Sequence, residues 1–138
     1  MAHYHDSGIA DIAFTADVDL TLKQYYFVTA ASTSGYVKVA NGASNPTVLG
    51  VLQNSPSAGG AAQVRVYGFS KIVAENGTCN LQFGTFATSG SDGQLEIVTL
   101  SGCPAVGRYT GANYTTAGSI YGEVLLFGGF SACISAST

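Results

Sequence analysis

Residues Val48 to Gly68, which read VLGVLQNSPSAGGAAQVRVYG, decide the fold because they combine a strand, a loop and a second strand. The beginning of the stretch is apolar, and Asn54 to Gly60 concentrate turn-forming residues. From Gln63 to Tyr67 the chain alternates, with valines on one face and polar or aromatic residues on the other. Gly50 and Gly68 mark points where a strand bends or another backbone comes close. The stretch therefore predicts a β scaffold, and it holds no residue typical of a catalytic site.

The same alternation continues in the rest of the chain. Ile12 to Leu22 carry an apolar residue at every second position, which predicts strand structure. Because strands usually span about five or six residues, we expect a break near Asp17 to Asp19. Tyr25 to Thr29 and Tyr36 to Val39 read as further strands, and no segment has a helical period. The sequence therefore predicts an all-β, single-domain protein that is either a β-sandwich or a barrel.

Two parts of the β domain, residues 24–68 and 82–128, indicate related β-meander halves. In each part a short strand meets a polar loop that ends in glycine, at Gly35 and at Gly93, and an alternating strand follows. Each part then closes with an apolar strand that runs into glycine. The alternative is that any β protein spaces its strands and glycine turns in this way. On this interpretation residues 11–130 form the domain, between an N-terminal arm (1–10) and a C-terminal tail (131–138).

The composition is poor in charge. Only 9% of the 138 residues are charged, against about 25% in a typical globular domain. Hydrophobic residues make up 46%, which excludes an ordinary disordered chain. Such a surface has little charge to keep it apart from its neighbours. Two interpretations stay open: an ordinary β protein with a Ser-, Thr- and Gly-rich surface, or a surface covered by a partner or by copies of the same chain.

Charge and hydropathy also exclude classes of partner. The five basic residues are scattered and the net charge is −3, so nucleic-acid binding has no electrostatic footprint. No apolar run is long enough for a membrane span. The N-terminal sequence MAHYHDSGIA lacks the regions of a signal peptide, so we expect the protein to be made and kept in a cytosol. There, Cys79, Cys103 and Cys133 would be small buried hydrophobes, with a Cys79–Cys103 bridge as the alternative.

The inventory of reactive groups gives no catalytic, cofactor or metal site. The histidines, His3 and His5, lie in the N-terminal arm, which is the wrong place for a preorganised base. The carboxylates Asp11, Asp17 and Asp19 invite a calcium site, but no glycine-turned loop or further acidic ligand follows them. We therefore expect these aspartates to form a solvated strand face, and we expect the protein not to be an enzyme.

Aromatic residues are numerous, with eight tyrosines and seven phenylalanines, but tryptophan is absent. These side chains could form a platform on which sugars stack. Because they are spread over the predicted strands, we expect most of them to be core residues and cross-strand partners.

Taken together, the short motifs of this chain resemble those of the small capsid decoration, or cement, proteins of tailed phages. The motifs follow one another along residues 8–128: Ile-x-Phe-Thr-Ala (12–16), Val-Leu-Gly-Val-Leu (48–52), Gly-Gly-x-x-x-Val-x-Val-x-Gly (59–68), Asp-Gly (92–93), Val-Gly (106–107) and Val-Leu-Leu (124–126).

The resemblance implies an all-β protein that assembles, often as a homotrimer, on the outer surface of an expanded phage head. There it would clamp neighbouring subunits of the major capsid protein, after being made in the host cytoplasm. Members commonly engage the shell through an N-terminal arm, so the implied contact residues here are His3, Tyr4, His5 and Ile9. A charge-poor surface suits such burial, which needs complementary area rather than catalysis.

Two other functions stay open at this point. One is a ligand- or glycan-binding β module on a virion appendage or cell surface, in which tyrosines contact sugars. The other is the major subunit of a self-assembling tube or shell, which would show open-ended rather than closed assembly.

Overall fold

The computed structural model describes residues 9–41, 48–74, 81–98, 104–113, 120–127 and 132–133. Within these ranges the chain has strands and no helix, so the prediction of an all-β fold is confirmed. This part of the chain also has no helix long and apolar enough to span a membrane. The strands are β1 (Ala10–Ala16), β2 (Phe27–Ala30), β3 (Tyr36–Val39), β4 (Val48–Leu52), β5 (Ala61–Ala74), β6 (Phe86–Ser89), β7 (Leu95–Ile97), β8 (Pro104–Ala105), β9 (Gly107–Tyr109), β10 (Ile120–Phe127) and β11 (Ala132–Cys133).

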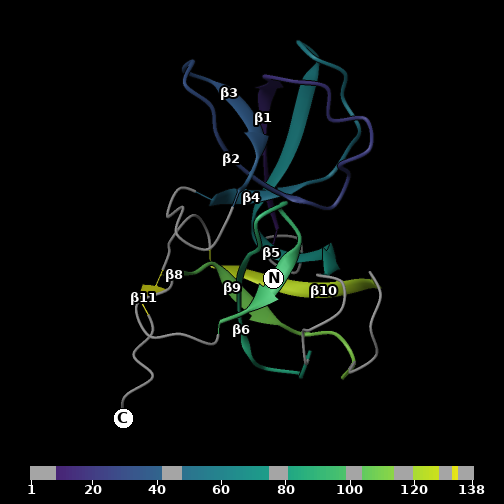
Figure 1. Ribbon diagram of the computed structural model, residues 1–138, viewed down its shortest axis with the longest axis vertical. Coiled ribbons are helices and arrows are strands. Elements are labelled where there is room, and N and C mark those ends of the chain that lie inside the picture. The colour runs from purple at the N-terminus through teal and green to yellow at the C-terminus, as the bar shows by residue number, and fades with distance from the viewer. Residues whose placement is uncertain are drawn as a thin grey trace, which may run out of the picture.

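Strand β5 is the centre of the fold. It has 14 residues, about twice the usual length of a strand. Its first half pairs with β1, from Ala61 to Tyr67, and its second half pairs with β10, from Tyr67 to Ala74. Figure 1 shows β1 to β4 gathered around one end of β5, and β6, β9 and β10 around the other end. The predicted strand, loop and strand of Val48–Gly68 thus become β4 and the first half of β5, which pair antiparallel.

Each half of β5 belongs to a closed ring of strands. In the first ring β1 pairs with β3, β3 with β2, β2 with β4, β4 with β5, and β5 again with β1. In the second ring β5 pairs with β7, β7 with β6, β6 with β9, β9 with β10, and β10 again with β5. The sequence predicted either a sandwich or a barrel. The closed rings correspond to the second alternative, as two small barrels that share one strand. The strands β8 and β11 form a separate antiparallel pair.

The two rings connect their strands in the same order. Each ring also has a glycine at the same position, where two strands approach closely. Gly50 of β4 lies opposite Val28, and Gly107 of β9 lies opposite Ala87. A Cβ atom at Gly50 would collide with the carbonyl oxygen of Arg65, and one at Gly107 would collide with that of Leu125. The shared plan also takes in β1 and the end of β5, which lie outside the predicted repeats 24–68 and 82–128. Duplication at the sequence level stays a prediction.

The loop glycines of the two halves differ in their surroundings. Gly35 and Gly93 both precede the alternating strand and both have a positive φ, of 83° and 85°. Gly35 is exposed with open space around it, whereas Gly93 is buried against Val39 and the backbone of Phe27. The Phe27 N–H donates a hydrogen bond of 2.8 Å to the Gly93 carbonyl. The loop of the second half therefore docks on the first half.

Two hydrophobic clusters fill the rings. The first, inside the first ring, contains Ala16, Leu20, Val28, Val37, Leu52, Ala62 and Val64. The second lies mainly in the second ring and contains, among others, Ile72, Ala74, Ala87, Leu95, Tyr109, Val124 and Leu126. Phe27 and Val51, which come from the first ring, also belong to the second cluster. Because the second core takes side chains from both halves, the protein forms one domain, not two independent ones.

The predicted long alternation of residues 12–22 is only partly strand. Strand β1 ends at Ala16, as the expected break near Asp17 requires, and the chain then turns. The buried Leu20 still packs in the first core, but Leu22 is 87% exposed. Alternation beyond Ala16 was therefore wrong as a sign of strand, because a turn can bury one of its apolar residues and expose the next.

The three aspartates of the calcium hypothesis do not gather. Asp11 forms a bidentate ion pair with Arg65 across β1 and β5, with Nε–Oδ1 at 2.8 Å and Nη2–Oδ2 at 3.1 Å. Asp19 accepts a hydrogen bond of 3.1 Å from the Thr21 N–H in the following turn. No group of three or more His, Cys, Asp or Glu side chains that could hold a metal ion occurs among the described residues. Cys79 and Cys103 lie outside these residues.

A substitution at Gly50 tests the close crossing of β4 and β5. We expect Gly50→Ala to lower the free energy of unfolding by about 3 kcal/mol, because the new Cβ forces the two backbones apart. Gly35→Ala is the matched control, since it meets open space and its positive φ costs only about 1 kcal/mol. Urea unfolding measures both variants. Equal stabilities of the two variants would contradict the assignment of a steric role to Gly50.

Candidate functional site at the junction of the two halves

A strained backbone marks the junction between the halves. Tyr25, just before β2, has φ 68° and is the one non-glycine residue with positive φ in the described part of the chain. An aromatic residue in the left-handed region costs about 1–3 kcal/mol and persists only where its surroundings hold it. Here the Tyr25 N–H donates to the Leu52 carbonyl at 2.7 Å, and the Val73 N–H donates to the Tyr25 carbonyl at 2.9 Å. One bond comes from β4 and the other from β5, so both halves fix this residue.

The Tyr25 side chain packs against Tyr121, a tyrosine of the other half. Its ring meets that of Tyr121 on β10 edge to face, with centroids 6.2 Å apart and planes at 90°. The Lys71 ammonium lies 4.8 Å from the Tyr121 ring centroid and 5.3 Å from that of Tyr25. Edge-to-face and cation–π contacts are each worth about 0.5–1.5 kcal/mol. Tyr121 is therefore positioned on two sides, although its side chain remains 65% exposed.

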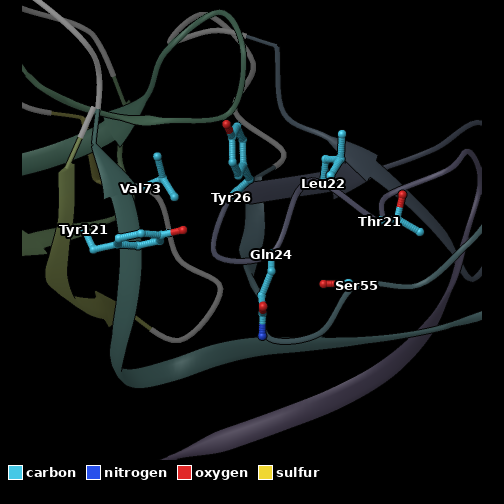
Figure 2. A pocket seen from close by; sticks show the side chains of 7 residues that line it. All are labelled: Thr21, Leu22, Gln24, Tyr26, Ser55, Val73 and Tyr121. Carbon is cyan, nitrogen blue, oxygen red and sulfur yellow. The ribbon is translucent and has the colours of Figure 1, made fainter. Parts of the chain in front are cut away.

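A cavity of about 390 Å³ opens beside this cluster, a volume in the range of small-molecule sites. Figure 2 shows its wall, with the Tyr121 hydroxyl directed toward the open space and Gln24 and Ser55 on the far side of it. Gln24 is fixed, because its Nε2 donates a hydrogen bond of 2.8 Å to the Gln53 carbonyl. The side chains of the wall are neutral, and they are Thr21, Leu22, Gln24, Tyr26, Ser55, Val73 and Tyr121.

Tyr121 also lines a second, larger hollow of about 730 Å³. Two charged residues line this hollow, Lys71 on β5 and Glu123 on β10, and they lie opposite each other in the strand register. Its aromatic wall includes Tyr109, whose buried ring donates from its hydroxyl to the Ala112 carbonyl at 2.8 Å. The first cavity is thus neutral and the second is charged, with one tyrosine common to both.

Two tyrosines of these hollows keep their protons at neutral pH. Burial raises the pKa of the Tyr26 hydroxyl, and the charges of Asp92 and Tyr121 raise it further. Burial and the Glu123 carboxylate raise the pKa of the Tyr109 hydroxyl in the same way. Both phenols are therefore hydrogen-bond donors under physiological conditions.

The residues expected to contact a capsid are mostly beyond the described part of the chain. His3, Tyr4 and His5 lie outside the described residues, and Ile9 is described and half exposed. Their predicted role stays a prediction.

Sequence reasoning missed the tyrosine cluster. Tyrosines were expected mainly in the core and in cross-strand pairs, which is true of Tyr109, whereas Tyr25, Tyr26 and Tyr121 gather at the junction. The available signal was the pair Tyr25–Tyr26, two consecutive aromatic residues at the start of a predicted strand. Their meeting with Tyr121 depends on the two rings sharing β5, which no local pattern contains.

The raised pKa of Tyr26 predicts a loss of stability at alkaline pH. Folding favours the neutral phenol, so the stabilisation is complete below the ordinary value of 10.0 and is lost as the pH rises through the higher pKa of the folded state. We expect Tyr26→Phe, which cannot ionise, and Asp92→Asn, which lowers the pKa of Tyr26, to lose less stability between about pH 8 and about pH 11 than the parent protein. Urea midpoints at both pH values measure this. An equal loss in all three proteins would show that Tyr26 is not desolvated.

Comparison with solved structures gives an informative likeness. No family model matches the chain, and no curated protein matches its sequence. Among solved structures, the N base of the head fiber protein gp8.5 of bacteriophage phi29 is similar to this chain with a TM-score of 0.61. The match covers 88% of this chain and 97% of the other, at 13% sequence identity. At this identity the likeness shows a shared fold over nearly the whole length of both chains.

Proposed function

We propose that this protein is a structural component of a phage head, bound to the outer surface of the capsid. The observation that carries the proposal is the fold shared with a head fiber base over 88% of the chain. The short sequence motifs resemble those of head decoration proteins. The sequence and the fold therefore favour the same class of protein.

The exposed side chains support a role in assembly. On the outer face of β5, Tyr67 is 47% exposed and Phe69 is 53% exposed, and Ile9 and Ile12 are exposed beside and along β1. Strand register places Ala10 of β1 opposite Tyr67, so Ile9 directly precedes the residue that faces Tyr67, whereas Ile12 lies opposite the inward Val64. Large exposed apolar side chains on a charge-poor surface are compatible with a contact surface between proteins.

In finer detail, we propose that three copies form a homotrimer that clamps neighbouring subunits of the major capsid protein. The arm of residues 1–10, with His3, Tyr4, His5 and Ile9, would reach the shell. Each stable contact of this kind needs on the order of 1,000 Å² of buried surface. Three contacts made by one trimer bind more tightly than one contact through their high effective concentration.

Binding to undecorated phage heads tests the proposal. We expect the purified protein to sediment with the heads at about micromolar concentration, and a variant that lacks residues 1–8 to bind at least about tenfold more weakly because the arm is lost. Phe83→Ser is the control for a general loss of apolar surface, because Phe83 is 70% exposed and lies in the turn before β6, outside β1 and β5.

A protein that stays in the supernatant at these concentrations would contradict the proposal as a whole. Light scattering on the free protein tests the trimer separately, since the chain mass is 14.1 kDa and a trimer has three times this mass. A monomer, both free in solution and after release from heads, would contradict the trimer alone.

A further inference from the structure

We propose that the neutral cavity at the junction of the two halves is a binding site for a neutral saccharide. This inference concerns a surface that the proposed attachment to a head does not use, and either proposal can fail without the other.

The wall of the cavity has the alternating chemistry that a sugar requires. Hydroxyl groups come from Tyr26, Tyr121 and Ser55, and Gln24 supplies an amide. Val73 provides an apolar surface among these polar groups. A saccharide presents hydroxyl groups and C–H faces in alternation, so a site of this class combines a few oriented polar groups with aromatic and aliphatic contact. The wall is too polar for a purely apolar ligand.

The charges near the cavity favour a neutral ligand over an anionic one. Among the described residues, no charged side chain lines the cavity. Two cations beside its aromatic residues are engaged with rings, because the Lys23 ammonium lies 4.6 Å from the Tyr26 centroid and the Lys71 ammonium lies 4.8 Å from that of Tyr121. A phosphate or carboxylate would lack the paired cationic donors that such groups usually receive.

The cavity is organised before any ligand arrives. Tyr121 is held by the edge of Tyr25 and by Lys71, yet 65% of its side chain remains accessible. The left-handed backbone of Tyr25, at φ 68°, sets the direction of this support. Strained residues of this kind gather at ligand sites, where they fix a geometry that would otherwise relax. A fixed aromatic ring reduces the entropy lost on binding.

The hydroxyl of Tyr26 adds a donor. A phenol with the ordinary pKa of 10.0 is protonated at neutral pH, and burial and the nearby Asp92 raise the pKa of Tyr26 further. Figure 2 shows Tyr26 and Tyr121 on different sides of the open space, from the segments before β2 and on β10. A ligand between them would contact both halves of the protein, so binding should also raise the resistance of the folded state to unfolding.

Titration calorimetry with maltotriose, cellotriose and chitotriose tests the inference, with trigalacturonic acid as an anionic probe of the same length. We expect at least one neutral trisaccharide to bind with a dissociation constant between about 10 µM and about 10 mM, and the anionic probe to bind at least about tenfold more weakly. The melting temperature should rise with the concentration of the bound sugar.

Variants locate the site. We expect Tyr121→Ala to weaken binding at least about tenfold and Tyr121→Phe to keep it within about threefold, because stacking depends on the ring. Leu22→Arg, at a position that is 87% exposed on the cavity wall, should also weaken binding without unfolding the protein. Tyr67→Ala is the matched control, since Tyr67 is exposed but lies outside the cavity, and it should bind as the parent does.

Three results would overturn the inference: no neutral trisaccharide binds up to about 10 mM, the anionic probe binds as well as the neutral ones, or Tyr121→Ala and Leu22→Arg both bind like the parent protein. Circular dichroism of each variant shows whether it is folded. If Tyr121→Ala is unfolded, Leu22→Arg decides the outcome.

Discussion

The whole structure depends on one strand that is shared by two barrels. The inward residues of β5 enter the first core at Ala62 and Val64 and the second at Ile72 and Ala74. Between them Gly68 is buried and has φ 94°, a conformation that glycine adopts without steric cost. This one turn of the backbone lets a continuous strand change partners from β1 to β10 near Tyr67. Neither ring closes without its half of β5, so the stabilities of the two halves are linked.

Patterns of period two were enough to predict the fold class, because each apolar residue of a strand must face a core. The valines Val64 and Val66 on one face of β5, and the exposed Gln63 and Tyr67 on the other, follow this rule. Closure into two rings was beyond the sequence, since it rests on contacts such as Ala74 with Leu95, and Thr15 with Tyr36, between distant strands. The break after β1 was expected, but the residues after it form a turn and not a second strand, because alternation alone cannot separate a strand from a turn that buries Leu20.

The candidate site illustrates a different limit of sequence reasoning. Composition and motifs led to the expectation of no catalytic or metal site, and they gave no reason to connect Tyr25 with Tyr121. These side chains meet because β5 belongs to both rings of strands and joins them. The left-handed backbone of Tyr25 then directs its side chain toward Tyr121. Lys71, an ordinary outward residue of a strand by its pattern, becomes part of the same cluster. Sites that lie between two halves of a domain have no local signature, since each half supplies only some of their residues.

The unequal surroundings of Gly35 and Gly93 have a consequence for how this chain can diverge. Two loops with the same position and the same backbone conformation face open space in one half and the neighbouring half in the other. The loop before Gly35 faces solvent, and a change in its length has to keep the hydrogen bond of 2.9 Å that the Gly35 carbonyl accepts from the Thr15 N–H of the same half. The loop before Gly93 has a further constraint, because Gly93 packs against Val39 and its carbonyl accepts from the Phe27 N–H of the other half. A longer loop is therefore easier to accommodate before Gly35, where it disturbs one half, than before Gly93, where it disturbs the contact between the halves.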